Sequence, residues 1–397
     1  MNSSAIANAT AADGNAEKYA RPTTDRLPGL DVLRALAILL VIEAHLRSWA
    51  FPWIRPLATW SGVDLFFLLS GYLIGSQVLR PYANRAQHSF LDFYLRRAFR
   101  ILPAYFFVLG LYFTIPILRG AERLSPLWKY LTFTLNLGLD AQKTNAFADV
   151  WSLCVEEHFY LCLPIVVYYL MRRPNLRKVV ILAVGTVVLG IALRSLLWIR
   201  YVRPLNVPGL RPRMVFEFLK VIYVPTYNRL DGLLIGVLLA ATQIFRPVWW
   251  SKITHNPNLL LAGGALLTVF SLWFFWDTVS FATSAVAFPF LVTGYGLLVL
   301  SSLSNESLLS KYRVAGAATV AKLAYSAYLT HQIVILFVRD RLGQILPLTG
   351  FLGIVLYYVS IFVVASALYV VVERPFLLLR CRILGRNSAG STSGNTH

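Results

Sequence analysis

An arginine and a histidine share one strongly apolar segment near the start of the chain. Residues 30–49 read LDVLRALAILLVIEAHLRSW, in which Arg34 and His45 stand eleven positions apart. In an α-helix this spacing points two side chains within about 20° of each other and separates them by ~16 Å along the axis. Imidazole exchanges a proton near neutral pH, and guanidinium binds anions. The segment therefore predicts a stripe that a long, narrow ligand with an anionic head could follow.

Carboxylates and one further arginine lie at the beginning of three other apolar segments. These residues are Asp64 in GVDLFFLLSGYLIG, Glu156 and Glu157 in WSLCVEEHFYL, and Arg229 and Asp231 in YNRLDGLLIG. Charge that faces lipid is costly, so such groups normally face a cavity or each other. We expect them at the same outer depth of the membrane as His45. A spacing of two points Arg229 and Asp231 to different sides of a helix, so Arg229 need not be the partner of Asp231.

A second histidine inside an apolar segment is His331, which lies in AYSAYLTHQIV with Tyr328 one turn before it. An ionisable group within a membrane segment is a candidate for function. A hydrogen bond that ties two helices together explains the same residue without chemistry. The sequence leaves both interpretations open.

Three arginines gather in the segment FLDFYLRRAFRILPAYF. Arg96 and Arg100 are four residues apart and share one face of a helix, whereas Arg97 is turned by about 100°. The guanidinium fork binds phosphate oxygens in pairs, so the cluster suits a phosphate-rich ligand. Basic residues at the cytoplasmic end of a helix also act simply as anchors. Both interpretations remain open from the sequence.

The composition is that of an integral membrane protein. Of 397 residues, 57% are hydrophobic and 14% are charged, whereas soluble domains are nearer half apolar and a quarter charged. Apolar runs of about 20 residues recur, and they must be helices because unpaired backbone groups are too costly in lipid. We predict an all-α polytopic fold with about ten transmembrane helices, near residues 30–49, 62–79, 101–118, 151–171, 178–199, 227–245, 258–276, 282–301, 321–338 and 350–372.

The formal net charge of +19 is explained by orientation in the membrane. Most Lys and Arg residues fall in cytoplasmic loops if both termini are cytoplasmic, so we expect no nucleic-acid partner. We predict a transmembrane domain at 28–376, surrounded by membrane lipid, with disordered cytoplasmic tails at 1–27 and 377–397. The three cysteines form no metal-type pattern with histidine, and we expect no metal.

Seven motifs occur in order along the chain. They are LDVLRALAILLVIEAHL, GVDLFFLLSGYLI, FYLRRAFRILPAYF, WSLCVEEHFYL, YNRLDGLLIGVLLA, AYSAYLTHQIV and VERP. Together they resemble the acyltransferase-3 family of integral membrane acyltransferases over about residues 30–375. Near His331 the chain departs from that family's pattern, with Thr330 where a tryptophan is customary.

The resemblance implies a transmembrane acyltransferase fold and transfer of an acyl group, often acetyl, from a cytosolic coenzyme A thioester. The acceptor would be a hydroxyl of a carbohydrate or glycolipid at the outer face of the cell membrane. The histidine that matches His45 is the catalytic one in the family. The family's arginines like Arg34, and those of its Arg-Arg-x-x-Arg motif, are linked to the acyl donor.

We therefore expect Arg96, Arg97 and Arg100 to hold the nucleotide end of acetyl-CoA, with Arg34 at the mouth of a channel. His45 would act either as general base or as acyl carrier, two mechanisms that the sequence does not separate. Glu156 is the second catalytic candidate. The expected acceptor-binding residues are Asp64, Glu157, Arg229, Asp231 and His331.

A secondary transporter or flippase of sugars or lipid-linked substrates is the alternative. Its intramembrane carboxylates and histidines would carry protons, and its halves would ordinarily be repeated with paired broken helices. The sequence has neither pattern. Transfer of label from acetyl-CoA in detergent distinguishes the two classes, because transport requires compartments. The oligomeric state does not follow from the sequence.

Overall fold

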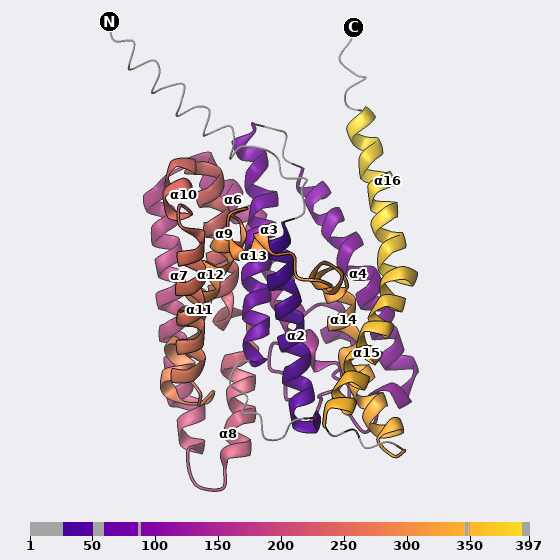
Figure 1. The fold of residues 1–397 in the computed structure, drawn as a ribbon. Coiled ribbons are helices and arrows are strands. Elements are labelled where there is room, and N and C mark those ends of the chain that lie inside the picture. Colours follow the sequence, from indigo (N-terminus) through magenta and orange to yellow (C-terminus); the bar gives the residue numbers. More distant parts are fainter. Residues whose placement is uncertain (1–26, 51–58, 86–88, 346–347, 349, 391–397) are drawn as a thin grey trace, which may run out of the picture.

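The computed structural model of the chain describes residues 27–50, 59–85, 89–345, 348 and 350–390. Within these ranges the chain is built of helices and has no strand, as the apolar composition predicts (Figure 1). Each of the ten predicted apolar segments is helical. The helices are α2 (Pro28–Ala50), α3 (Gly62–Ala83), α4 (Phe90–Thr114), α6 (Trp151–Arg172), α7 (Leu176–Leu197), α9 (Leu230–Phe245), α11 (Pro257–Phe274), α12 (Phe288–Ser302), α14 (Ala317–Phe337) and α15 (Gly350–Leu368).

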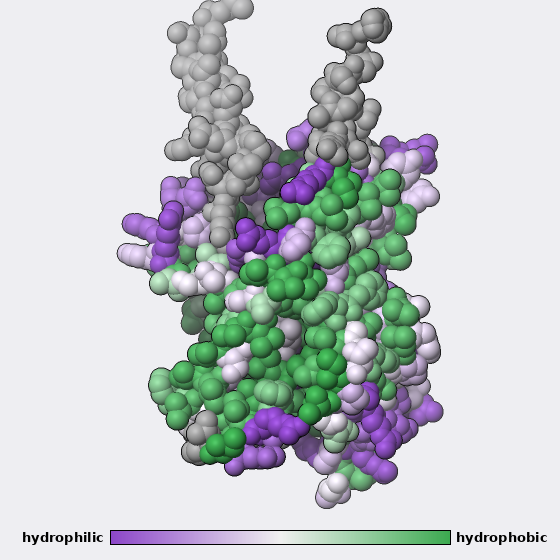
Figure 2. Space-filling view, turned by 90° about the vertical axis from the view of Figure 1, so that its right-hand side faces the viewer, coloured by the Kyte–Doolittle hydropathy of each residue, from purple (hydrophilic) through white to green (hydrophobic). Residues whose placement is uncertain are grey.

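Seven helices of the described chain are long and apolar enough to cross a membrane, or eight if the bent pair α9 and α10 (Pro247–Ile253) forms one span. The predicted number of about ten is therefore not confirmed. Of the predicted segments, α2 and α4 fall short because they carry intramembrane charges, and α9 because it has only 16 residues. Figure 2 shows a broad apolar band between hydrophilic residues at the two ends of the molecule, as a polytopic membrane protein requires.

Short helices and turns connect the long helices. The short helices are α5 (Leu127–Leu131), α8 (Arg211–Phe218), α10 and α13 (Leu308–Lys311), and the 3-10 turns are Thr59–Ser61, Pro116–Arg119, Ala148–Val150, Arg203–Leu205 and Thr226–Asn228. Five-residue π-helical segments occupy Trp198–Val202, Leu219–Tyr223, Thr283–Ala287, Val338–Leu342 and Tyr369–Glu373. The turn Ala148–Val150 leads directly into α6 and so fixes where that helix begins.

Helices α3 and α9 approach each other unusually closely, because glycines face one another. A Cβ atom on Gly71 would lie 2.1 Å from the backbone oxygen of Leu233, and one on Gly236 would lie 2.3 Å from that of Leu68. Small residues permit this approach between membrane helices and increase the contact between their backbones. The pair α3 and α9 therefore forms a rigid frame beside α2.

Helix α2 lies in the middle of the bundle and packs against α3 and α14 (Figure 1). Its buried Ile38 and Ile42 join an apolar cluster with Ile335 of α14 and Ile361 of α15. The helix that carries Arg34 and His45 is thus enclosed by its neighbours. Polar side chains on such a helix must point into cavities or toward each other.

The C-terminal segment differs from the disordered tail predicted at 377–397. Helix α16 (Arg374–Gly390) continues from α15 through the π-helical segment, and the apolar span extends over Gly350–Leu384. The reason is the run of apolar residues after Pro375, of which Leu384 is buried. Residues 391–397, and residues 1–26 of the tail predicted at 1–27, lie outside the described residues. The start of α2 and the end of α16 lie toward the same end of the bundle (Figure 1).

Candidate active site

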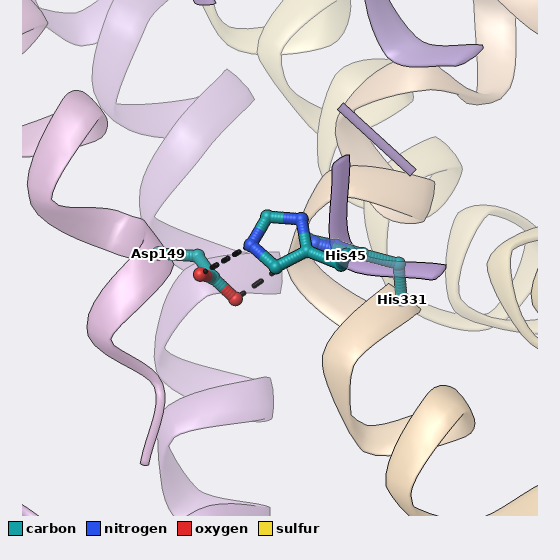
Figure 3. A group of neighbouring side chains, drawn as sticks. All are labelled: His45, Asp149 and His331. Atoms are coloured by element: carbon teal, nitrogen blue, oxygen red, sulfur yellow. Dashed lines mark hydrogen bonds and ion pairs between the residues drawn. The ribbon is translucent and has the colours of Figure 1, made fainter. Parts of the chain in front are cut away.

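Two histidines and one aspartate from three separate elements meet inside the bundle. His45 comes from α2, His331 from α14, and Asp149 from the turn before α6. Nε2 of His45 lies 3.0 Å from Oδ1 of Asp149, and Nε2 of His331 lies 3.8 Å from Oδ2. The two imidazole rings pack edge to face with their centroids 4.8 Å apart. Figure 3 shows the carboxylate facing these rings, so both imidazoles lie near the same negative charge.

The second nitrogen of each ring fixes its orientation. Nδ1 of His45 donates to the backbone oxygen of Val41 at 2.8 Å, and Nδ1 of His331 donates to that of Tyr328 at 2.7 Å. Because a carbonyl oxygen only accepts, Nδ1 carries hydrogen in both rings and Nε2 is the nitrogen that exchanges a proton. Nε2 of His331 is buried and has no hydrogen-bond partner within the described chain. His45 is 32% exposed on its side chain and His331 is 0% exposed, so His45 is the accessible member.

The same three groups are close enough to bind a cation. Both Nε2 atoms and a carboxylate oxygen lie within 4.8 Å of one another, and imidazoles that donate Nδ1 to a backbone oxygen are usual metal ligands. From the sequence no metal is expected. The hydrogen bond between His45 and Asp149 satisfies two of the three groups without one.

One wall of a cavity of about 510 Å³ is formed by His45 and Asp149. This histidine cavity is otherwise mainly apolar, and its aromatic residues are Trp60, Trp151, Phe218, Tyr223, Phe288 and Tyr328. Aromatic faces with a few fixed polar groups suit an amphipathic ligand such as a sugar ring. The cavity therefore presents a proton-exchanging pair to a ligand that packs on aromatic side chains.

A second cavity, of about 780 Å³, is lined by six arginines. This arginine cavity contains all four residues predicted to bind the acyl donor, together with two that the sequence analysis did not name: Arg34, Arg80, Arg96, Arg97, Arg100 and Arg380. The guanidinium of Arg97 stacks over the ring of Tyr160 at 4.0 Å. Arg34 lies near the start of α2 and His45 near its end, so the two cavities lie toward opposite ends of the bundle.

Glu156 lies in the arginine cavity, where it accepts a hydrogen bond from Ser70 at 2.6 Å. The prediction placed it at the depth of His45 as a second catalytic residue. Helix α6 begins at Trp151, as predicted, but Glu156 stands almost two helical turns beyond Asp149 and lines the other cavity. Glu157 lines neither cavity among the described residues, and its Oε1 is buried without a hydrogen-bond partner there.

The remaining predicted acceptor-binding residues form buried ion pairs. Oδ1 of Asp64 lies 3.0 Å from Nη2 of Arg229, and Oδ2 of Asp231 lies 2.7 Å from Nη1 of Arg194. The partner of Asp231 is thus Arg194 of α7 and not its neighbour Arg229. Of the described residues that line the two cavities, none belongs to these pairs, so direct contact with an acceptor is not supported for Asp64, Arg229 or Asp231.

Arg229 nevertheless packs against aromatic residues that line the histidine cavity. Its guanidinium lies over the rings of Phe288 at 4.2 Å, Tyr223 at 4.7 Å and Trp151 at 5.7 Å. All three rings also line the cavity. A buried cation stacked on several aromatic faces holds those faces in place. Arg229 thus contacts the aromatic wall of the cavity without lining the cavity itself.

Two acidic residues near the histidines were missed by sequence reasoning. Asp149 precedes the WSLCVEEHFYL motif by two residues, outside the apolar run that marked it as a helix. Glu122 lies in the loop before α5, close enough to Asp149 and His45 for their charges to act on it. Burial, together with the nearby carboxylate of Asp149, raises the pKa of Glu122 to about 7. Proximity to a sequence motif was the available signal for Asp149, and Glu122 had none.

Comparison with known proteins links this arrangement to a family. The family model described as an acyltransferase domain matches residues 27–370. This range includes His45, Asp149, His331 and five of the six arginines of the arginine cavity, and it leaves out Arg380 of α16.

Curated relatives of the chain are named as O-acetyltransferases. The O-acetyltransferase OatA of Staphylococcus aureus strains NCTC 8325 / PS 47 and COL is in each case 26% identical over 370 residues, covering 85% of this chain and 55% of the relative. The chain thus spans little more than half the length of these curated relatives. No solved structure matches the chain.

Proposed function

Because this chain belongs to the acyltransferase-3 family, we propose that it transfers an acetyl group from acetyl-CoA to a carbohydrate-type hydroxyl across the membrane. The donor enters the arginine cavity from the cytoplasm, and the acceptor, a carbohydrate or glycolipid, enters the histidine cavity at the outer face. The observation that carries the proposal is one helix, α2, with a phosphate-binding residue type near one end and a proton-exchanging pair near the other.

The arginine cavity fits the chemistry of the donor. Coenzyme A carries three phosphate groups at its nucleotide end, and six arginines line this cavity. Guanidinium groups bind phosphate oxygens in pairs and remain charged at all physiological pH values. The pantetheine arm is thin and extended, so it suits a passage between helices that ends at the thioester. Arg96, Arg97 and Arg100 hold the phosphates, and Arg34 lies along the path toward His45.

The histidine cavity fits an acceptor with hydroxyl groups and an apolar face. Its aromatic wall packs against sugar C–H groups, whereas an imidazole and a carboxylate on its surface come from His45 and Asp149. The relatives named O-acetyltransferase support acetyl as the acyl group. Both termini of this chain are then cytoplasmic, which agrees with the bias of basic residues.

The chemistry follows from the His45–Asp149 pair. Nε2 of His45, unprotonated in the neutral ring, takes the proton of the acceptor hydroxyl while the hydroxyl oxygen attacks the thioester carbonyl carbon. The protonated Nε2 then donates to Oδ1 of Asp149 across 3.0 Å, and the negative charge of this carboxylate stabilises the imidazolium. The new C–O bond forms, the C–S bond breaks, and the proton returns to the thiolate of coenzyme A. No metal is required for these steps.

The test is label transfer by the purified protein in detergent, supplied with radiolabelled acetyl-CoA and membranes of the producing cells as acceptor. We expect labelled acceptor with the wild-type protein, also in the presence of EDTA, and none with His45→Ala. The control is Gln142→Ala, an exposed outer-loop change outside both cavities. Wild-type rates with His45→Ala would remove this histidine from the chemistry. Movement of a sugar across sealed vesicles without label transfer would favour the transporter or flippase class.

A further inference from the structure

Of the described residues, Tyr328 alone lines both cavities. It lies on α14, one turn before His331, and its part-buried hydroxyl contacts Ser152 of α6. The acetyl group of the proposed reaction must pass from one cavity to the other. A thioester that passes from the arginine cavity toward His45 therefore passes the side chain of Tyr328.

The hydroxyl group of Tyr328 is held by two polar partners. It donates to the backbone oxygen of Asp149, and the hydroxyl of Ser152 lies 2.7 Å from it. Because the carbonyl oxygen of Asp149 only accepts, the phenol proton points there, and Ser152 donates its own proton to the phenol oxygen. A hydrogen bond received at the oxygen makes the phenol a stronger donor through cooperative polarisation.

Tyr328 is also connected by hydrogen bonds to Asp149 and His331. The residue whose backbone it contacts, Asp149, bonds to His45 through its side chain. Its own backbone oxygen accepts from His331 at 2.7 Å. A donor at this position can turn from the backbone of Asp149 to a carbonyl oxygen that arrives from the arginine cavity, with only a small motion.

We propose that Tyr328 is a catalytic residue whose hydroxyl donates a hydrogen bond to the thioester carbonyl oxygen during acyl transfer, an inference that rests on the proposed function. As the acceptor oxygen attacks, negative charge develops on the carbonyl oxygen, and the phenol hydrogen bond stabilises it. Tyr328 keeps its proton throughout. The acceptor proton goes to the His45–Asp149 pair and then to the leaving thiolate, so the phenol changes neither its charge nor its bonds.

The experiment compares Tyr328→Phe with Tyr295→Phe. The second change is matched, because Tyr295 also has a buried hydroxyl paired with a serine, Ser61, at 2.6 Å, but it lines neither cavity. The assay uses radiolabelled acetyl-CoA and membranes of the producing cells, and yields an apparent kcat and a KM for acetyl-CoA. Equilibrium binding of acetyl-CoA checks that each variant is folded with an intact donor cavity.

We expect Tyr328→Phe to lower kcat by about 10²–10³-fold, the usual effect of removing one oxyanion donor, with KM and binding of acetyl-CoA within about threefold of wild type. Ser152→Ala should lower kcat by up to about tenfold, because it removes a neutral hydrogen bond behind the phenol. Tyr295→Phe should keep the wild-type kcat.

Three results would overturn the role of Tyr328. A wild-type kcat in Tyr328→Phe would show that the hydroxyl is not used. A raised KM with unchanged kcat would assign it to donor binding alone. Equal losses of kcat in Tyr328→Phe and Tyr295→Phe would mark a general packing effect. A wild-type protein that transfers no label would instead overturn the proposed function itself, and this role with it.

Discussion

Nε2 of His45 and Oδ1 of Asp149 lie 3.0 Å apart although the residues are 104 positions apart in the sequence. The hydrogen bond joins the end of α2 to the turn before α6, and it lies on the wall of the histidine cavity. Since Nδ1 of His45 is bound to the backbone of Val41, the carboxylate acts on the one nitrogen that exchanges a proton. The pair, rather than the histidine alone, is the unit of the proposed chemistry.

Asp149→Asn should abolish most of the activity while the fold is retained. The amide keeps the size of the carboxylate but removes the charge that stabilises the imidazolium of His45. General acid–base catalysis contributes about 10²–10⁴-fold, so we expect a loss of that order in kcat for label transfer. Asp140→Asn is the control, because Asp140 is paired with Lys143 in the same loop region and lines neither cavity. Similar activity of the two variants would contradict the role of Asp149.

Arg97→Ala should weaken donor binding more than turnover. The side chain lines the arginine cavity and stacks on Tyr160. A hydrogen bond to a charged group contributes about 1.5–3 kcal/mol, which corresponds to a rise of about 10–100-fold in KM for acetyl-CoA. Arg177→Ala, at the start of α7, lies outside the cavity and should leave KM unchanged. An unchanged KM in Arg97→Ala would argue against phosphate binding at this site.

Glu122 should make stability depend on pH near neutrality. Burial and the charge of Asp149 raise the pKa of Glu122 to about 7 from an ordinary value of 4.5. The folded state therefore holds this proton more tightly than the unfolded state, and stability falls as pH rises from about 4.5 to about 7. Glu122→Gln should remove this part of the decline in thermal stability, measured by thermal unfolding in detergent between pH 5 and pH 8. Identical pH profiles for variant and wild type would rule the pKa assignment out.

Arg194→Ala should unfold or strongly destabilise the protein. Arg194 is completely buried and pairs with Asp231, so its loss leaves an uncompensated charge inside the bundle. Breaking such a pair costs about 3–5 kcal/mol. Arg211→Ala breaks the exposed pair with Asp277, and exposed pairs contribute about 0–1 kcal/mol. Thermal unfolding of both variants in detergent makes the comparison, and equal stability of the two would contradict the structural role of Arg194.

The helices could be predicted well because lipid leaves the backbone few alternatives. Every apolar run near 20 residues became a helix, since its backbone groups must be paired internally. The number of spans was less certain, because α2 and α4 carry charges that serve the interior of the bundle. The disordered tail predicted at 377–397 was wrong for residues 377–390, which belong to helix α16. The burial of Leu384 depends on neighbours that the sequence does not reveal.

The site could be predicted only in part. The resemblance to the acyltransferase-3 family grouped Arg34 of α2 with the arginines of α4, and all four arginines line one cavity. Helical spacing fixes direction only along a single helix. It could not choose partners across helices, so Asp231 was left without Arg194, and Asp149 was overlooked in a turn. Glu156 was placed at the depth of His45 although the start of α6 was predicted, because the sequence does not show that the arginine cavity reaches the second turn of that helix. Contacts between distant segments require the fold itself.

The most direct measurement is the sidedness of the donor site. Sealed right-side-out and inverted membrane vesicles are supplied with radiolabelled acetyl-CoA, which does not cross the bilayer. We predict that only the inverted vesicles, which expose the arginine cavity, label their acceptor, and that Arg97→Ala lowers this labelling. Labelling of right-side-out vesicles at the same rate would contradict a donor that enters from the cytoplasm and an acyl group that crosses the bundle to His45.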